Sequence, residues 1–120
     1  MATPSAAAIE QFMHTQVSCW NSADKAGFFA AYEAIAPGGI QIEYVGGVSG
    51  EGMAILQGMW AQQQPKIDIE EVALIVIGSE AVAHNRNKVK GTSMAIETIE
   101  QYVFADDGSL LVRYFIKQPG

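Results

Sequence analysis

The chain has 120 residues and a net charge of −6, from seven basic and thirteen acidic side chains. This length fits one domain with one core, residues 1–120. The acidic balance argues against nucleic acid as a partner, because such binding draws its affinity from Lys and Arg at phosphates. No apolar run approaches the roughly 20 residues that cross a bilayer, and the N-terminus lacks the segments of a secretory signal. We therefore expect a cytoplasmic protein with no membrane partner.

The residues that usually hold metals or cofactors are sparse. The single cysteine, Cys19, excludes an internal disulfide and supplies no metal-binding set. His14 and His84 have no partners at metal-ligand spacing, and glycine loops that cradle phosphates are absent. His14 is expected at the surface, and His84 on the strand face of Arg86 and Lys88. We expect no metal and no cofactor.

The first half of the chain predicts two helices, a strand and a third helix. Residues 5–36 carry apolar side chains at spacings of three and four, interrupted at 21–24, where Ser22 is expected to cap the second helix. Pro37-Gly38-Gly39 ends that helix. Alternation predicts a half-buried strand at 40–45, and helical spacing returns from Gly50 to about Gln64.

The second half predicts four strands, at 67–77, 81–90, 94–104 and 110–117, with Asp107-Gly108 as a hairpin turn. Helices followed by a run of antiparallel strands indicate an α+β fold. We expect three helices packed on the concave side of a strongly curved mixed sheet. Such a cone encloses an internal pocket.

Glu100 is the strongest candidate for a functional group. Its strand face also carries Met94, Ile96, Thr98, Tyr102 and Phe104. A carboxylate in this position is either a pocket acid or an ordinary outward glutamate, and the apolar neighbours favour the pocket. Burial without a cation would raise its pKa, leaving it protonated and able to donate a hydrogen bond.

Three stretches carry a resemblance to a known family. They are Trp20-Asn-Ser-Ala-Asp24 before Phe28 and Tyr32, the Ser49-Gly50-Glu51 entry to the third helix, and Ile99-Glu-Gln-Tyr-Val-Phe104 followed by Asp106-Asp107-Gly108. Because of these three stretches, the chain resembles the nuclear-transport-factor-2-like superfamily, specifically its SnoaL-like and steroid Δ-isomerase-like branch. The resemblance implies a cystatin-like cone. This fold hosts isomerases, dehydratases, hydrolases and non-catalytic modules.

The steroid isomerases use a general-base Asp, and an oxyanion hole formed by a Tyr and a protonated Asp. The resemblance places Glu100 at the protonated Asp and Tyr32 at a supporting Tyr. Gln16 would stand at the oxyanion Tyr and Tyr44 at the base, with Glu43 one residue earlier and facing away. The usual base is therefore missing.

Further side chains are expected to shape the ligand site. The aromatic candidates are Trp20, Tyr44, Trp60 and Tyr102, which are either pocket walls or core. Asn85 and Asn87 either orient a carbonyl or hydroxyl group of the ligand or bond to backbone groups. Both alternatives stay open.

The last strand has two contrasting faces. One carries Leu110, Val112, Tyr114 and Ile116, and the other Leu111, Arg113, Phe115 and Lys117. Periodicity leaves open which face lines the pocket, whereas the resemblance places Arg113 inward, where it could pair with Glu100. The other face is expected to be covered by a second subunit, giving a homodimer through the sheet.

We therefore expect a protein that binds a hydrophobic small molecule. One hypothesis is a cofactor-independent isomerase or lyase that acts on a cyclic ketone or alcohol by acid–base chemistry, with Glu100 as the acid and Tyr32 orienting it. The other is a non-catalytic ligand-binding or dimerisation module of the same fold. A protein–protein adaptor would require a partner on the sheet.

Overall fold

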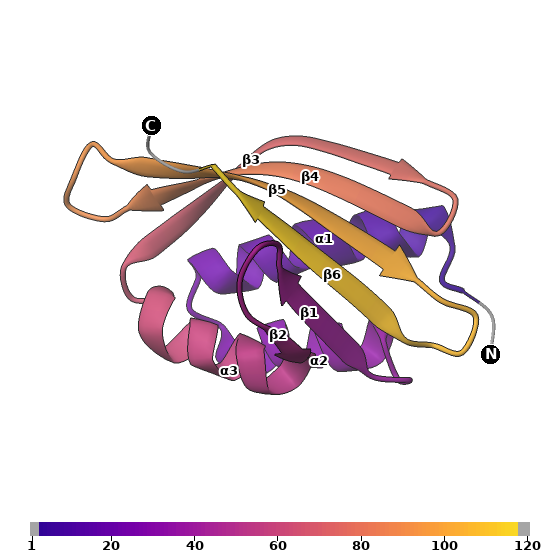
Figure 1. Ribbon diagram of the computed structural model, residues 1–120. Helices are drawn as coiled ribbons and strands as arrows, with labels where there is room; N and C mark the ends of the chain where they lie inside the picture. Colours follow the sequence, from indigo (N-terminus) through magenta and orange to yellow (C-terminus); the bar gives the residue numbers. More distant parts are fainter. Residues whose placement is uncertain (1–2, 118–120) are drawn as a thin grey trace.

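The computed structural model describes residues 3–117, so the first two and last three residues of the expected domain lie outside it. Three helices pack on a six-stranded mixed sheet (Figure 1), which confirms the predicted α+β fold. In chain order the elements are α1 (Ala6–Asn21), α2 (Lys25–Ile35), β1 (Ile40–Tyr44), β2 (Ser49–Glu51), α3 (Gly52–Gln63), β3 (Ile67–Ile77), β4 (Glu80–Val89), β5 (Ala95–Phe104) and β6 (Leu110–Ile116).

The helices begin at side-chain caps. Ser5 caps α1, and Glu51 accepts two backbone N–H groups at the start of α3. Between α1 and α2, Ala23 adopts a positive φ of 59°, and the Asp24 carboxylate accepts the Gly27 N–H at 3.0 Å. The predicted cap, Ser22, instead ends α1. Asp24 caps α2 because its carboxylate satisfies one of the amides that a helix start leaves unpaired.

The strands follow the order β2-β1-β6-β5-β4-β3. All neighbours are antiparallel except β1 and β6, which run parallel. The ladder between β3 and β4 shifts register between Glu71 and Ala73. Such a bulge bends a strand, and Figure 1 shows that β3 is strongly bent along its length. The three-residue β2 was not predicted, because it is too short for alternation to be visible.

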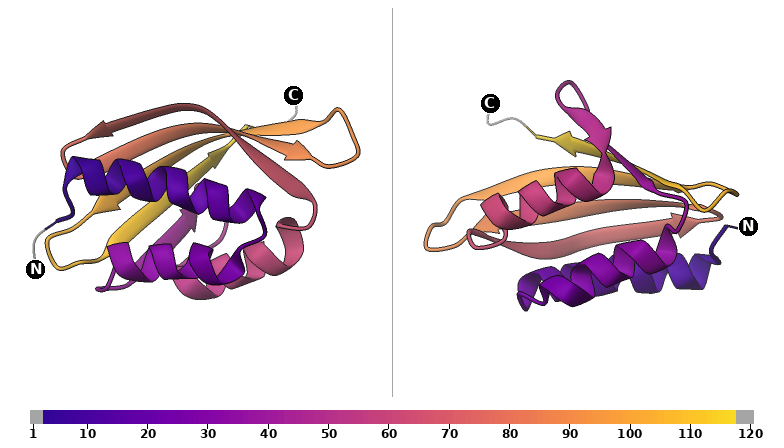
Figure 2. Two further views of the ribbon diagram at one scale, coloured as in Figure 1. Left: turned by 180° about the vertical axis from the view of Figure 1, so that it is seen from behind. Right: turned by 90° about the horizontal axis from the view of Figure 1, so that it is seen from below.

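The helices lie on one side of the sheet. α1 and α2 run side by side across it, and α3 leads into β3 (Figure 2). The core fills the space between α1, α2 and the inner faces of the strands, and its side chains include Ile9, Phe12, Tyr32, Ile42 and Val112. None of the described helices is long and apolar enough to cross a membrane.

Candidate functional site

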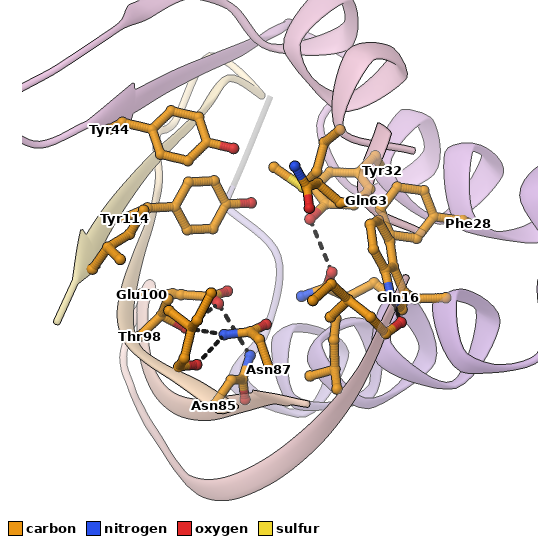
Figure 3. Close-up of a pocket in the computed structure, with 16 residues that line it drawn as sticks. Gln16, Phe28, Tyr32, Tyr44, Gln63, Asn85, Asn87, Thr98, Glu100 and Tyr114 are labelled. Carbon is orange, nitrogen blue, oxygen red and sulfur yellow. Dashed lines mark hydrogen bonds between the residues drawn. The ribbon is translucent and has the colours of Figure 1, made fainter. Parts of the chain in front are cut away.

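A cavity of about 270 Å³ lies between the inner face of the sheet and the three helices. All three helices and every strand except β2 contribute to its wall (Figure 3). The lining residues are Gln16, Trp20, Phe28, Tyr32, Tyr44, Met59, Gln63, Ile67, Ile69, Asn85, Asn87, Ile96, Thr98, Glu100, Tyr114 and Ile116. The wall is mostly apolar and aromatic, with polar groups gathered on β4 and β5. This composition is typical of a small-molecule site.

Glu100 lines this cavity as the sequence predicts, and it is 7% exposed. Three side chains donate to its carboxylate. Tyr102 Oη donates to Oε1 at 2.9 Å, while Thr98 Oγ1 and Asn85 Nδ2 donate to Oε2 at 3.0 and 3.2 Å. The two-residue period of β5 places the first two donors on the same face as Glu100. The carboxylate is therefore fixed in one orientation.

Burial raises the pKa of Glu100, and the hydrogen bonds from Tyr102, Thr98 and Asn85 offset only part of that rise. No Lys, Arg or His is among the cavity-lining residues in the part of the chain that the structure describes. The carboxyl group thus keeps the elevated pKa of a desolvated acid. Such a group is a stronger base than an exposed glutamate, and it can donate a hydrogen bond once protonated.

A chain of hydrogen bonds connects Glu100 to both N-terminal helices. Tyr32 Oη donates to Gln16 Oε1 at 3.0 Å, and Gln16 Nε2 donates to Tyr102 Oη at 3.1 Å. Burial raises the pKa of both tyrosines, so they remain protonated donors. Tyr32 therefore reaches Glu100 through Gln16 and Tyr102 rather than by direct contact.

The two asparagines lie on β4, and both line the cavity. Asn87 Nδ2 donates to the Ile96 carbonyl at 2.9 Å and to Thr98 Oγ1 at 3.1 Å. Asn85 is 2% exposed, and its Nδ2 faces Glu100. Its Oδ1 is buried and has no partner among the described residues. Asn87 therefore bonds to a backbone group, which is one of the two expected alternatives, whereas Asn85 bonds to the side chain of Glu100.

Tyr44 and Tyr114 form a second polar wall. Their ring centroids lie 5.1 Å apart, and Figure 3 shows both hydroxyls pointing into the cavity. Burial, followed by the charge of Glu100, raises the pKa of Tyr44, while burial raises that of Tyr114 well above its ordinary value. Tyr114 was not among the predicted site residues. The alternation along β6 places Tyr114 on the apolar face of the strand, but the sequence could not show that this face lines the cavity.

Arg113 lies on the opposite face from the one that the resemblance implied. Its neighbour Tyr114 faces the cavity, so Arg113 points to the outer face, where its Nε donates to Glu43 Oε1 at 3.1 Å. It pairs with Glu43 and not with Glu100, so the expected inward position is wrong. The apolar face of β6 is the one that lines the cavity.

Two predicted pocket residues, Trp60 and Tyr102, are not among the residues that line the cavity. Trp60 packs against Trp20 and Phe28, with ring centroids 5.4 and 5.1 Å away. Tyr102 is fully buried and acts on the site through its hydroxyl. The structure brings the remaining predicted residues, Gln16, Trp20, Tyr32, Tyr44, Asn85, Asn87 and Glu100, together around the cavity.

The histidines lie outside this site. His14 Nδ1 is 2.9 Å from Glu71 Oε1, and His84 Nε2 is 2.6 Å from Glu97 Oε1 on the outer face of the sheet. Over residues 3–117, no group of three or more His, Cys, Asp or Glu side chains could hold a metal ion.

No family model matches the chain, and a search of curated proteins finds no relative. Solved structures do resemble it. A protein of unknown function with a cystatin-like fold from Methylobium petroleophilum PM1 superposes with a TM-score of 0.74 at 21% identity, over 98% of this chain and 81% of that one. A proposed ketosteroid isomerase from Kribbella flavida gives 0.65 at 12% identity, over 92% and 78%. An LEH-like epoxide hydrolase from M. tuberculosis gives 0.66 at 13% identity, over 98% and 83%.

SnoaL-like and NTF2-like proteins are also among the similar structures. The chain therefore has the cystatin-like fold of these NTF2-like proteins, as its sequence predicts. At these identities the likeness establishes the fold alone. The chemistry has to be argued from the cavity itself.

Proposed function

We propose that the protein binds an apolar, ring-containing small molecule and moves a proton on it through Glu100, as a cofactor-independent isomerase or lyase of a cyclic ketone or alcohol. The observation that carries this proposal is a single buried carboxyl group, with a raised pKa, in an otherwise neutral and largely apolar cavity. A volume of about 270 Å³ suits one compact ring system. Perturbed carboxyl groups in such cavities are typical of acid–base sites.

The hydrogen bonds of Glu100 favour a role as a general base. A carboxylate offers about four acceptor positions, and three of them are filled by Tyr102, Thr98 and Asn85. The remaining position belongs to Oε1, where a substrate proton can be accepted. Enzymes raise the pKa of glutamate for this task. Glu100 therefore takes the proton first and returns it as the acid, which extends the purely acidic role that the resemblance implies.

Tyr44 and Tyr114, the tyrosine wall of the cavity, supply hydrogen-bond donors for an oxygen atom of the substrate. A ketone loses an α-proton more easily when donors stabilise the oxyanion that develops. The hydroxyls of Tyr44 and Tyr114 both point into the cavity from β1 and β6. In this arrangement a carbonyl oxygen lies against these hydroxyls while the adjacent carbon faces Glu100. Tyr32 and Gln16 act as positioning residues through Tyr102.

The test is α-proton exchange of 2-decalone in D₂O, followed by ¹H NMR. We expect the wild type to accelerate exchange over buffer, and Glu100→Gln to lose about 10²- to 10⁴-fold of that acceleration. Glu43→Gln is the matched control, because Glu43 lies on the outer face beside Arg113. Equal exchange rates in Glu100→Gln and the wild type would refute the role of Glu100.

A non-catalytic binding module of the same fold is the second candidate. The observation that favours it is that Glu100 is the only carboxyl group, with no histidine or lysine beside it, among the described residues that line the cavity. One group must then serve as both base and acid. Saturable binding of 2-decalone without faster exchange would select this candidate.

The outer face of the sheet supports a homodimer. Exposed apolar side chains on it include Val82, Ile99, Leu111 and Phe115. Cross-strand pairing places Ile99 directly beside Phe115 and His84. We propose that a second copy of this chain covers this face in the cytoplasm, because apolar sheet faces of this kind mark interaction sites.

A further inference from the structure

One end of the cavity is open to solvent. Within residues 3–117, the cavity-lining residues that are exposed are Gln63, Ile96 and Ile116. Ile96 is 40% and Ile116 42% exposed, whereas Glu100 is only 7% exposed. The two isoleucines therefore mark the mouth of the cavity, and Glu100 lies in its interior.

The pairing of the strands fixes how far the mouth is from Glu100. Glu100 pairs with Tyr114 across β5 and β6. Two residues earlier on β5, Thr98 pairs with Ile116. Ile96 lies two residues before Thr98, on the same face of the strand. At about 3.3 Å per residue, the Ile96 position is roughly 13 Å from that of Glu100 along β5. This separation exceeds the length of a single six-membered ring.

The wall near the mouth is mainly apolar. Ile69 on β3 and Ile96 on β5 flank Asn87 of β4 in register, and all three line the cavity. The amide nitrogen of Asn87 is bonded to the Ile96 carbonyl and to Thr98 Oγ1. Ile116 lies diagonally across from Ile96, at a separation that one apolar chain can bridge. The isoleucines thus form an apolar path from the interior of the cavity to its mouth.

Such a path favours an apolar occupant. Both isoleucines of the mouth expose apolar surface to water in the free protein. An apolar chain that covers them removes this surface from water, which is favourable in proportion to the area buried. A polar chain would gain little from the same side chains and would lose part of its hydration.

We infer that the ligand is elongated: its oxygen-bearing ring lies at Glu100, and an apolar chain on that ring leaves the cavity over Ile96 and Ile116. The inference rests on the proposed function, which fixes the ring at Glu100. It narrows the substrate class from compact rings to ring ketones or alcohols that carry an alkyl or similar chain of several carbons. The cavity of about 270 Å³ holds the ring, and the mouth holds the chain. Ile96 and Ile116 are thus the residues that select for the chain.

The experiment measures the binding of 4-alkylcyclohexanones with methyl, propyl, pentyl and heptyl chains. Dissociation constants come from Trp fluorescence, since Trp20 lines the cavity. We expect affinity for the wild type to rise about two- to fourfold with each added methylene group, because each moves from water to an apolar surface. In Ile96→Ser and Ile116→Ser, the ratio of heptyl to methyl affinity should fall by about threefold or more. Ile99→Ser is the matched control and should keep the wild-type ratio, since Ile99 is 43% exposed on the outer face of the same strand.

A second measurement needs no variant, so the inference stays testable even if the serine variants do not fold. In ¹³C-methyl NMR of the wild type, the heptyl compound should shift the Ile96 and Ile116 signals more than the methyl compound does. Equal shifts with both compounds would overturn the inference. Equal affinities across the series, a chain-length gain that survives unchanged in both serine variants, or no binding of any member at its solubility limit would overturn it as well.

The exchange assay with 2-decalone keeps the two proposals apart. Exchange without a preference for longer chains removes only the inference. A preference for longer chains without exchange removes only the catalytic role, because the chain requires the ring to lie at Glu100 but not to react there.

Discussion

Tyr102 donates a 2.9 Å hydrogen bond to Glu100 Oε1 from two positions further along the same face of β5. Tyr102 in turn accepts from Gln16, which accepts from Tyr32. This contact therefore connects the carboxyl group of the sheet to α1 and α2. It also opposes the effect of burial on the pKa of Glu100. The hydrogen bond favours the ionised carboxylate, whereas burial favours the neutral acid.

The raised pKa of Glu100 predicts how stability depends on pH. Below the ordinary glutamate pKa, Glu100 is protonated in both the folded and the unfolded chain, and its contribution is fully present. As pH rises, the unfolded chain loses this proton first, so the free energy of unfolding falls until the folded carboxyl ionises as well. The loss is about 1.4 kcal/mol for each unit by which the folded pKa is raised.

Urea unfolding between acid and neutral pH measures this decline. Glu100→Gln should remove it, whereas Glu43→Gln, the same change on the outer face, should retain it. If Glu100→Gln declines as steeply as the wild type, another group causes the effect.

Tyr102→Phe removes one of the three donors to Glu100 and also the acceptor of Gln16 Nε2. Burial then acts with less opposition, so we expect the pKa of Glu100 to rise further. The unpaired groups should destabilise the fold by about 1–3 kcal/mol. Carboxyl ¹³C NMR gives the titration and urea unfolding the stability. Tyr44→Phe is the matched control, since its hydroxyl is not one of the three donors to Glu100, and a larger pKa rise in that variant would contradict the network.

The site residues on β5 could be predicted because a strand alternates locally. Glu100 faces the cavity with Thr98, while Ile99 between them is exposed, as period two requires. The resemblance misplaced Arg113. The antiparallel hairpin of β5 and β6 pairs Glu100 with Tyr114 and Gln101 with Arg113, so Tyr114 shares the cavity face and Arg113 the outer face. The parallel pairing of β1 with β6 sets Glu43 opposite Arg113 across 70 residues of chain, and no local pattern encodes that pairing.

The sequence could not predict that Asn85 Oδ1 lacks a hydrogen-bond partner among the described residues. An asparagine on an alternating strand predicts which face it takes, and Asn85 does face the cavity. Which end of its amide is free depends on Glu100, which lies 15 residues further along the chain. By contrast, element types follow from local spacing, so the helices and the long strands were predicted within a few residues.

Because Arg113 points to the outer face of the sheet, we expect its replacement to have small effects on stability and on Glu100. Its pair with Glu43 is partly exposed on both sides, so solvent screens it. Arg113→Ala should change the free energy of unfolding by less than about 1 kcal/mol. Glu100 should titrate as in the wild type, since the two side chains lie on opposite faces of the sheet. A large shift in that titration would instead place the guanidinium near the cavity.

Two glycines of α3 should respond oppositely to alanine. A Cβ on Gly52 would lie 2.3 Å from Ile40 Cγ2 and 2.9 Å from the Ile40 carbonyl oxygen, so α3 and β1 would have to separate. Gly52→Ala should cost about 1–3 kcal/mol. At Gly58 nothing lies within 4 Å, and alanine should stabilise the helix by about 0.5–1 kcal/mol. Chemical unfolding compares the pair, and equal effects would contradict the close packing of α3 on β1.

The outer face of the sheet predicts the oligomeric state. Ile99 and Phe115 are neighbours across β5 and β6, and both are exposed in one chain. If a second copy covers them, light scattering should give about twice the 12.9 kDa mass of the chain. Ile99→Lys should then yield monomers, because a buried ammonium without a partner is strongly unfavourable. Val48→Lys tests the specificity of that effect, since Val48 is 68% exposed in the turn before β2 and lies outside this face. A monomeric wild type, or a dimer that withstands Ile99→Lys, would mean that the face is covered in some other way or left open.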